Sequence, residues 1–172
     1  MGAPKTIQLG EICRRLDVRE RDARYVLEQG HVPRGVDEAP ASGNYRQFGP
    51  GPAFWLGMVL KLKAAGVQGP LAVEVADYAD QALRGITQNL SWDWAFSPAQ
   101  GKFDTEHRYF LDVGDRQFVR VVTDAGPSSG GRLEEFDWHP IEKLRKPAES
   151  CRPWVVMRLD LTKIAEQLAD AF

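Results

Sequence analysis

The residues of this chain that could do chemistry without a cofactor are arginines grouped near its start. Arg19, Arg21 and Arg24 lie within six residues of one another, and Tyr25 follows directly. A guanidinium presents N–H donors in a planar fork, which suits phosphate oxygens and the edge of guanine. Arg46 lies between two aromatic residues in a separate segment. This set of side chains permits contact with a phosphate-bearing partner.

Another interpretation of the same segment is a plain solvated helix face. The arginines alternate with acidic residues, namely Glu20, Asp22 and Glu28. Oppositely charged residues four positions apart, such as Arg24 and Glu28, stabilise an exposed helix without any partner. Both interpretations remain open at this level.

Composition restricts the class of protein. The net charge of −2 is unlike that of a general polyanion binder, although residues 1–66 hold 10 Lys and Arg against 7 Asp and Glu. Residues 67–172 hold 12 against 17, so the first part of the chain is the more basic one. Cys13 and Cys151 form neither a disulfide framework nor a CxxC motif. The sequence shows neither the apolar core of a signal peptide nor an apolar run long enough for a membrane span. We therefore expect a cytoplasmic protein with free thiols.

Hydrophobic periodicity predicts the elements that position the arginines. Four apolar residues recur with the spacing of one helix face, namely Leu9, Ile12, Cys13 and Leu16. Asp17 then breaks the pattern, and Asp is among the few residues that tolerate the left-handed conformation. A second helix is expected over about residues 19–29, with Gly30 as its C-terminal stop. Two short helices joined by such a turn form a helix-turn-helix.

Further helices are expected over 53–65, which is strongly apolar, and over 70–85. Beyond them the pattern changes to strands: two β-rich runs flank Gly114-Asp115, a hairpin signal, and residues 154–159 form a third run. Asp160 is expected to cap a last helix. Helices followed by a small antiparallel sheet and a terminal helix predict an α+β fold.

The N-terminal residues resemble the MerR-type winged-helix transcription regulators over roughly residues 7–85. The matching residues are Leu9-Gly10-Glu11-Ile12-Cys13, Asp17-Val18, Arg24-Tyr25, Gly30, Arg46-x-Phe48, Leu56, Val59, Leu62 and Gly66. The chain departs from the family pattern at Asp22, commonly Thr, and at Val26, where a second aromatic is usual. The long coiled coil that dimerises family members is absent after Gly85.

The resemblance implies a DNA-binding domain over 1–85, with the second helix in the major groove. Five side chains are then expected to contact double-stranded DNA: Arg19, Arg21, Arg24, Tyr25 and Arg46. The expected wing, after a turn at Gly43-Asn44, also includes Asn44, Tyr45 and Gln47. Phe48 is expected to anchor the wing in the core. Cys13 is expected to be a buried thiol.

The second part of the chain offers no catalytic motif, so no enzyme activity, cofactor or metal site is expected. Asp115 suits a tight turn better than acid–base chemistry. We expect a linker over 86–104 and a β-rich dimerisation or effector domain over 105–172. The expected dimer contacts lie on the terminal helix and on three tryptophans, namely Leu161, Ile164, Leu168, Trp92, Trp94 and Trp154.

These observations predict a homodimeric, sequence-specific DNA-binding transcription regulator of bacterial or phage type, because one helix-turn-helix reads too few bases alone. The alternative is a winged-helix protein-interaction or DNA-assembly accessory, as in excision or packaging. An enzyme with its chemistry in the β-rich part is the third hypothesis. The sequence identifies no small-molecule effector.

Overall fold

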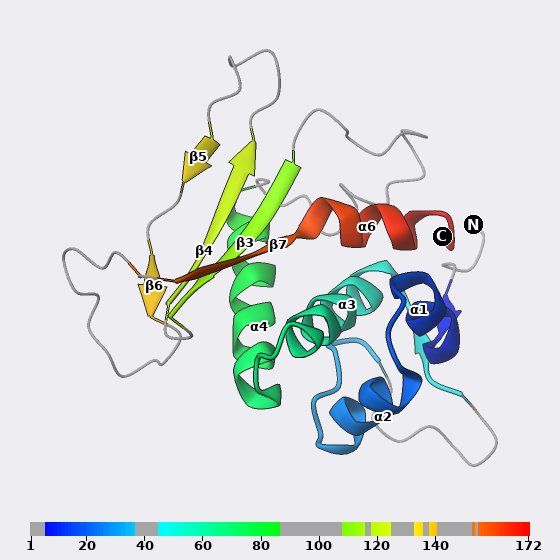
Figure 1. Ribbon diagram of the computed structural model, residues 1–172. Coiled ribbons are helices and arrows are strands. Elements are labelled where there is room, and N and C mark those ends of the chain that lie inside the picture. The colour runs from blue at the N-terminus through cyan, green and yellow to red at the C-terminus, as the bar shows by residue number, and fades with distance from the viewer. Residues whose placement is uncertain are drawn as a thin grey trace.

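The protein has an α+β fold, as predicted (Figure 1). The structure, a computed structural model, describes residues 6–36, 45–86, 108–115, 118–124, 133–135, 138–140, 153 and 155–172. These stretches contain five helices, a two-stranded sheet and a five-stranded sheet. No helix within them is both long enough and apolar enough to cross a membrane.

The first two helices, α1 (Leu9–Leu16) and α2 (Glu20–Glu28), form the predicted pair. Asp17 ends α1 in the left-handed conformation, with φ 50° and ψ 54°, so the corner predicted at this residue is confirmed. The N–H of Val18 donates to the carbonyl of Cys13 at 3.0 Å, which closes the end of α1. The chain therefore changes direction between α1 and α2 within a short turn.

A two-stranded sheet ties the chain before α1 to the chain before α3. Strand β1 (Ile7–Gln8) pairs antiparallel with β2 (Gln47–Phe48), with Ile7 opposite Phe48. Phe48 is fully buried, so its predicted place in the core is confirmed. The turn predicted at Gly43 and Asn44 lies outside the described residues.

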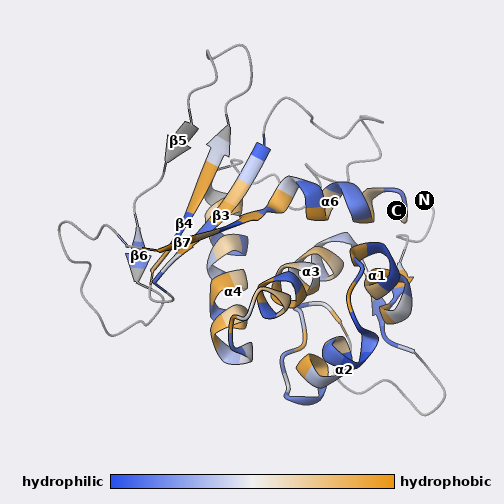
Figure 2. Ribbon diagram, in the orientation of Figure 1, coloured by the Kyte–Doolittle hydropathy of each residue, from blue (hydrophilic) through white to orange (hydrophobic). Residues whose placement is uncertain are grey.

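Helix α3 (Pro50–Ala64) occupies the centre of the helical part and is followed by α4 (Gly69–Ile86). Helix α3 begins three residues earlier than predicted because proline is well suited to the first turn of a helix. Every residue from 53 to 60 is buried, as expected of a helix that is apolar all round. Figure 2 shows the hydrophobic segments on α3, α4 and the central strands of the larger sheet.

The larger sheet has the order β5-β4-β3-β7, and β6 also pairs with β4. Its strands are β3 (Arg108–Gly114), β4 (Phe118–Asp124), β5 (Leu133–Glu135), β6 (His139–Pro140) and β7 (Val156–Asp160). Strands β3 and β4 form the hairpin predicted at Gly114-Asp115, with Gly114 opposite Phe118. The predicted third strand is β7, antiparallel to β3. Helix α4 packs against β4, so the helices and the sheet share one core.

Helix α6 (Leu161–Ala169) follows β7 directly and packs against α1 and α3 (Figure 1). Its predicted cap is confirmed, because the N–H of Lys163 donates to the Asp160 carboxylate at 2.9 Å. The side chains on its apolar face are 0–2% exposed within the single chain, namely Leu161, Ile164 and Leu168. The predicted dimer contact through these residues is therefore corrected: the face fills the chain's own core.

The predicted tryptophan contacts at 92, 94 and 154 lie outside the described residues, as does the linker predicted for 86–104 apart from Ile86. A Cβ built on Gly57 of α3 would lie 3.0 Å from Cγ2 of Ile164 and 2.9 Å from Cδ1 of Leu16. The glycine therefore lets α1 and α6 approach the backbone of α3 closely.

Truncating the buried face of α6 tests this packing. We expect Leu168→Ala to lower the free energy of unfolding by about 3 kcal/mol, the usual cost of a cavity at a fully buried leucine. Glu166→Ala, an exposed change on the same helix, should alter it by less than about 0.5 kcal/mol. Urea denaturation followed by circular dichroism measures both, and equal stabilities of the two variants would contradict the described position of α6.

Candidate nucleic-acid interface

Helix α2 has one buried and one exposed face. Ala23, Val26 and Leu27 are buried against the rest of the helical core. The opposite face exposes Arg21 and Arg24 together with Tyr25, which is 55% exposed. Tyr25 is therefore a surface residue and not part of the core.

Arg24 is held by an acidic neighbour on its own helix. Its Nη2 lies 2.6 Å and its Nε 3.0 Å from Oε1 of Glu20. The hydrogen-bonded partner is therefore Glu20, one turn before Arg24, whereas Glu28, the partner suggested by the solvated-face interpretation, contributes through its charge. The hydrogen bond to Glu20, followed by the charge of Glu20, raises the pKa of Arg24 above its ordinary value.

Two other segments reach the surface around Arg24. After the charge of Glu28, the phenol of Tyr45 in the arm before β2 adds the smallest contribution that raises the pKa of Arg24, so this phenol lies within electrostatic range of Arg24. Tyr45 is 73% exposed. The Nζ of Lys63, near the end of α3, lies 4.8 Å from the centre of the Tyr25 ring. We call the residues brought together here, Arg21, Arg24, Tyr25, Tyr45 and Lys63, the α2 surface.

Of the remaining predicted DNA-contact and wing residues, the structure describes Arg19, Arg46 and Gln47. Arg19 is exposed just before the first turn of α2, where its carbonyl accepts from the N–H of Asp22 at 3.0 Å. Arg46 is partly buried and interacts with another group. Gln47 is exposed on β2, and its amide oxygen accepts from Oγ1 of Thr6 at 3.1 Å. The predicted wing residue Asn44 lies outside the described residues.

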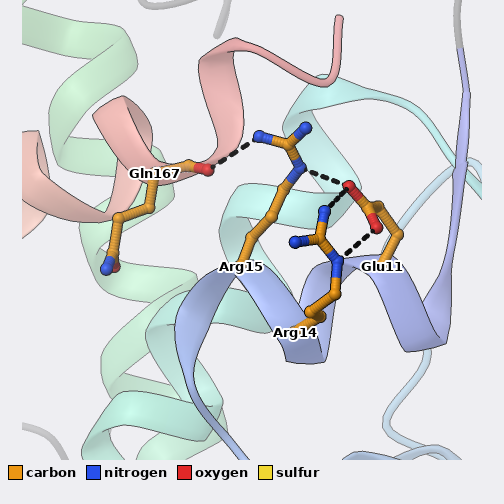
Figure 3. Close-up of polar contacts among 4 residues, drawn as sticks. All are labelled: Glu11, Arg14, Arg15 and Gln167. Carbon is orange, nitrogen blue, oxygen red and sulfur yellow. Dashed lines mark hydrogen bonds and ion pairs between the residues drawn. The ribbon is translucent and has the colours of Figure 1, made fainter.

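A second charged group lies on α1, where Glu11 binds two arginines (Figure 3). The Glu11 carboxylate accepts from Nη2 and Nε of Arg14 at 2.6 and 2.9 Å and from Nε of Arg15 at 2.6 Å. Arg15 also donates to the carbonyl of Gln167 at 3.4 Å, which links α1 to the end of α6. Sequence reasoning missed this group, although its spacings of three and four residues could have indicated it.

The two arginines change the titration of Glu11. The hydrogen bond from Arg14, and then the one from Arg15, lower the pKa of the carboxyl from 4.5 to about 2. A carboxyl whose pKa is lower in the folded state stabilises the fold above its unfolded pKa, and this contribution is lost as the pH falls through the folded value.

We therefore expect Glu11→Gln to destabilise the protein by a constant amount above about pH 4.5, and by progressively less as the pH falls toward about 2. The free energies of unfolding of the variant and the parent, compared between pH 7 and pH 3, measure this difference. Glu166→Gln is the control, since it removes an exposed carboxyl from α6. A difference that does not depend on pH would contradict the described ion pairs.

The most deeply buried charge of the described residues is Asp112 on β3. Its carboxylate accepts from Nε and Nη2 of Arg158 at 2.6 and 2.8 Å and from Nε of Arg120 at 3.1 Å. The two arginines lie on the neighbouring strands, directly across from Asp112. One carboxylate bound by two guanidinium groups from the neighbouring strands joins three strands of the sheet.

Asp115 has a local structural role, as expected. It occupies the hairpin turn with φ 48° and accepts from the N–H of Val155 at 2.9 Å. Cys13 is 4% exposed, so its predicted burial is confirmed. Burial, and then the charge of Glu20, raises the pKa of the Cys13 thiol to about 11. In the part of the chain that the structure describes, no group of three or more His, Cys, Asp and Glu residues could hold a metal ion.

An open pocket of about 280 Å³ lies between the loop 30–34 and the helices α3 and α4. Trp55 in its wall donates from Nε1 to the Asp77 carboxylate at 2.8 Å. Its lining also includes an imidazole, a guanidinium and a second carboxylate, from His31, Arg34 and Asp80. Positively and negatively charged side chains both line this pocket, so its lining indicates neither an anionic nor a cationic ligand.

Comparisons of the chain with protein-family models, with characterised proteins and with solved structures found no match. The resemblance to MerR-type regulators therefore stays a prediction. Function is inferred from the arrangement of the side chains.

Proposed function

We propose that the protein is a transcription regulator that binds double-stranded DNA as a homodimer, with α1 and α2 acting as the helix-turn-helix of a winged-helix domain. One observation carries this proposal: residues of α2, of the arm before β2 and of the end of α3 meet on the α2 surface. That surface carries two exposed arginines, two exposed tyrosines and the partly buried Lys63. Cations beside exposed aromatic rings suit a phosphate backbone.

In this proposal the start of α2 enters the major groove, which is wide enough to admit a helix. Arg19 and Arg21 face base edges, where a guanidinium can bind guanine through two hydrogen bonds. Arg24 and Tyr25, farther along the helix, contact phosphates and fix the register. Tyr45 and Arg46 contact the backbone beside the groove.

The ion pair between Arg24 and Glu20 is compatible with this role. Both side chains are exposed, so the pair contributes little to stability and a phosphate oxygen can replace the Glu20 carboxylate. Asp22, at the same end of α2, is exposed and can accept a hydrogen bond from the amino group of cytosine. Glu20 and Asp22, which lie beside the α2 surface, then favour particular sequences instead of general affinity for DNA.

Removing two of the proposed phosphate contacts tests the proposal. We expect Arg24→Ala with Arg46→Ala to weaken binding to all duplexes by about tenfold to a hundredfold and to reduce the slope of log K against log salt by about two. Fluorescence anisotropy with labelled duplexes between 50 and 300 mM salt gives both quantities. Lys163→Ala, an exposed cation on α6, is the control and should leave the slope unchanged.

Failure of the unsubstituted protein to bind any duplex at the lowest salt concentration would contradict the proposal. The protein-interaction or DNA-assembly alternative would then remain.

Releasing Arg24 from its carboxylate should have the opposite effect. We expect Glu20→Gln to raise affinity for duplex DNA by about two- to fivefold, since an exposed ion pair is weak and a nearby negative charge repels phosphate. Glu166→Gln makes the same change of charge on α6 and should have a smaller effect. Equal gains from the two substitutions, measured by the same anisotropy titration, would show that net charge alone and not the Arg24 pair controls binding.

A further inference from the structure

We propose that a second copy of this chain docks on the outer edge of β7, so that the two five-stranded sheets join antiparallel across a twofold axis. This inference rests on the proposed function insofar as a regulator that reads two half-sites must be a dimer. The apolar face of α6 is enclosed in the chain's own core, so the contact between copies must lie elsewhere.

Strand β7 is the last strand in the order β5-β4-β3-β7, and among the described strands it pairs with β3 alone. Just beyond the paired strands, the N–H of Asp115 donates to the carbonyl of Val155. The backbone groups of Val155 are therefore directed toward β3. Because antiparallel bonding alternates along a strand, Met157 and Leu159 also bond inward. The backbone groups of the intervening residues, Val156 and Asp160 among them, are directed at the outer edge.

Exposed apolar side chains mark the same edge. The structure describes four large hydrophobic residues as exposed, of which Tyr25 and Tyr45 belong to the α2 surface. The other two, Val155 and Val156, are adjacent at the start of β7 and are 69% and 44% exposed. An edge strand with apolar side chains is a template for pairing with another strand. A second β7 supplies both the backbone groups and the apolar side chains that this edge requires.

The length and the charges of β7 select one register for this pairing. Residues whose backbone groups are directed outward must pair with one another, so one allowed register becomes the next when one strand slides by two residues. The centre of the pairing then moves by one residue. Registers centred on Val156 or Leu159 pair only three described residues, because α6 begins at Leu161 on one side and residue 154 lies outside the described part on the other. A register centred on Arg158 would place two guanidinium groups directly opposite each other, which is unfavourable.

The register centred on Met157 pairs residues 155–159 of both copies. Val156 of each copy then lies opposite Arg158 of the other, whose aliphatic stem can cover it. Val155 lies opposite Leu159 on the other face of the sheet, so both exposed valines gain an apolar neighbour. The strand carries one positive and one negative charge, Arg158 and Asp160, so two copies do not repel each other.

Light scattering coupled to size-exclusion chromatography tests the dimer with the full chain. We expect a mass of twice 19.3 kDa at micromolar concentration. Val156→Lys would face Arg158 of the second copy and should weaken the dimer by about tenfold, whereas Val156→Glu should maintain or strengthen it. The side chain of Val156 is exposed, and circular dichroism confirms that each variant folds.

Hydrogen exchange of the Val156 amide gives a measurement that needs no substitution, and its protection should rise with protein concentration. A monomeric mass of the parent protein would overturn the inference. The edge of β7 would then be covered by the same chain or by another partner. Equal effects of Val156→Lys and Val156→Glu would also overturn the inference. The Arg24→Ala, Arg46→Ala variant should stay dimeric, so a dimer without affinity for DNA would contradict the proposed function alone.

Discussion

The structure depends on the need to enclose α3 on every side. Its residues from 53 to 60 are all buried, so no face of the helix can be left to solvent. Helices α1, α2, α4 and α6 each pack against it. Removing apolar surface from water is the largest favourable term in the free energy of folding, roughly 25 cal/mol per Å² buried. The positions of the other helices follow from this requirement.

Enclosing α3 determines which surfaces remain for partners. Helix α6 returns from the sheet to cover α3 beside α1, where Arg15 donates to the carbonyl of Gln167. Its apolar face is thereby used within one chain. The outer face of α2 stays exposed because only its inner face is needed against α3. The inner side of this short helix thus completes the core, and its outer side is the one that the proposed function assigns to DNA.

Features set by neighbouring residues could be predicted from the sequence. The left-handed corner at Asp17, the hairpin turn at Asp115 and the cap at Asp160 each follow from the chemistry of one or two residues. The amphipathic spacing of α1 and α2 likewise indicated their buried faces. For the candidate site, this local information placed Arg21, Arg24 and other exposed groups on α2.

Features that join distant segments could not be predicted in this way. Periodicity shows that the face of α6 is apolar, but not that α1 and α3 cover it instead of a second copy. The bond between Arg158 and Asp112 joins residues 46 positions apart, and no local pattern identifies such a pair. The contact of Lys63 with Tyr25 depends in the same way on how α3 crosses α2.

Selection of bound duplexes from a random pool shows whether the α2 surface reads sequence. Sequence-specific binding by a dimer predicts enrichment of a consensus with two inverted half-sites, centred about 10 base pairs or a multiple of this distance apart. Inversion would report the twofold symmetry of the bound protein. Recovery of the input sequences without enrichment, at a salt concentration where the protein retains DNA, would contradict sequence-specific binding.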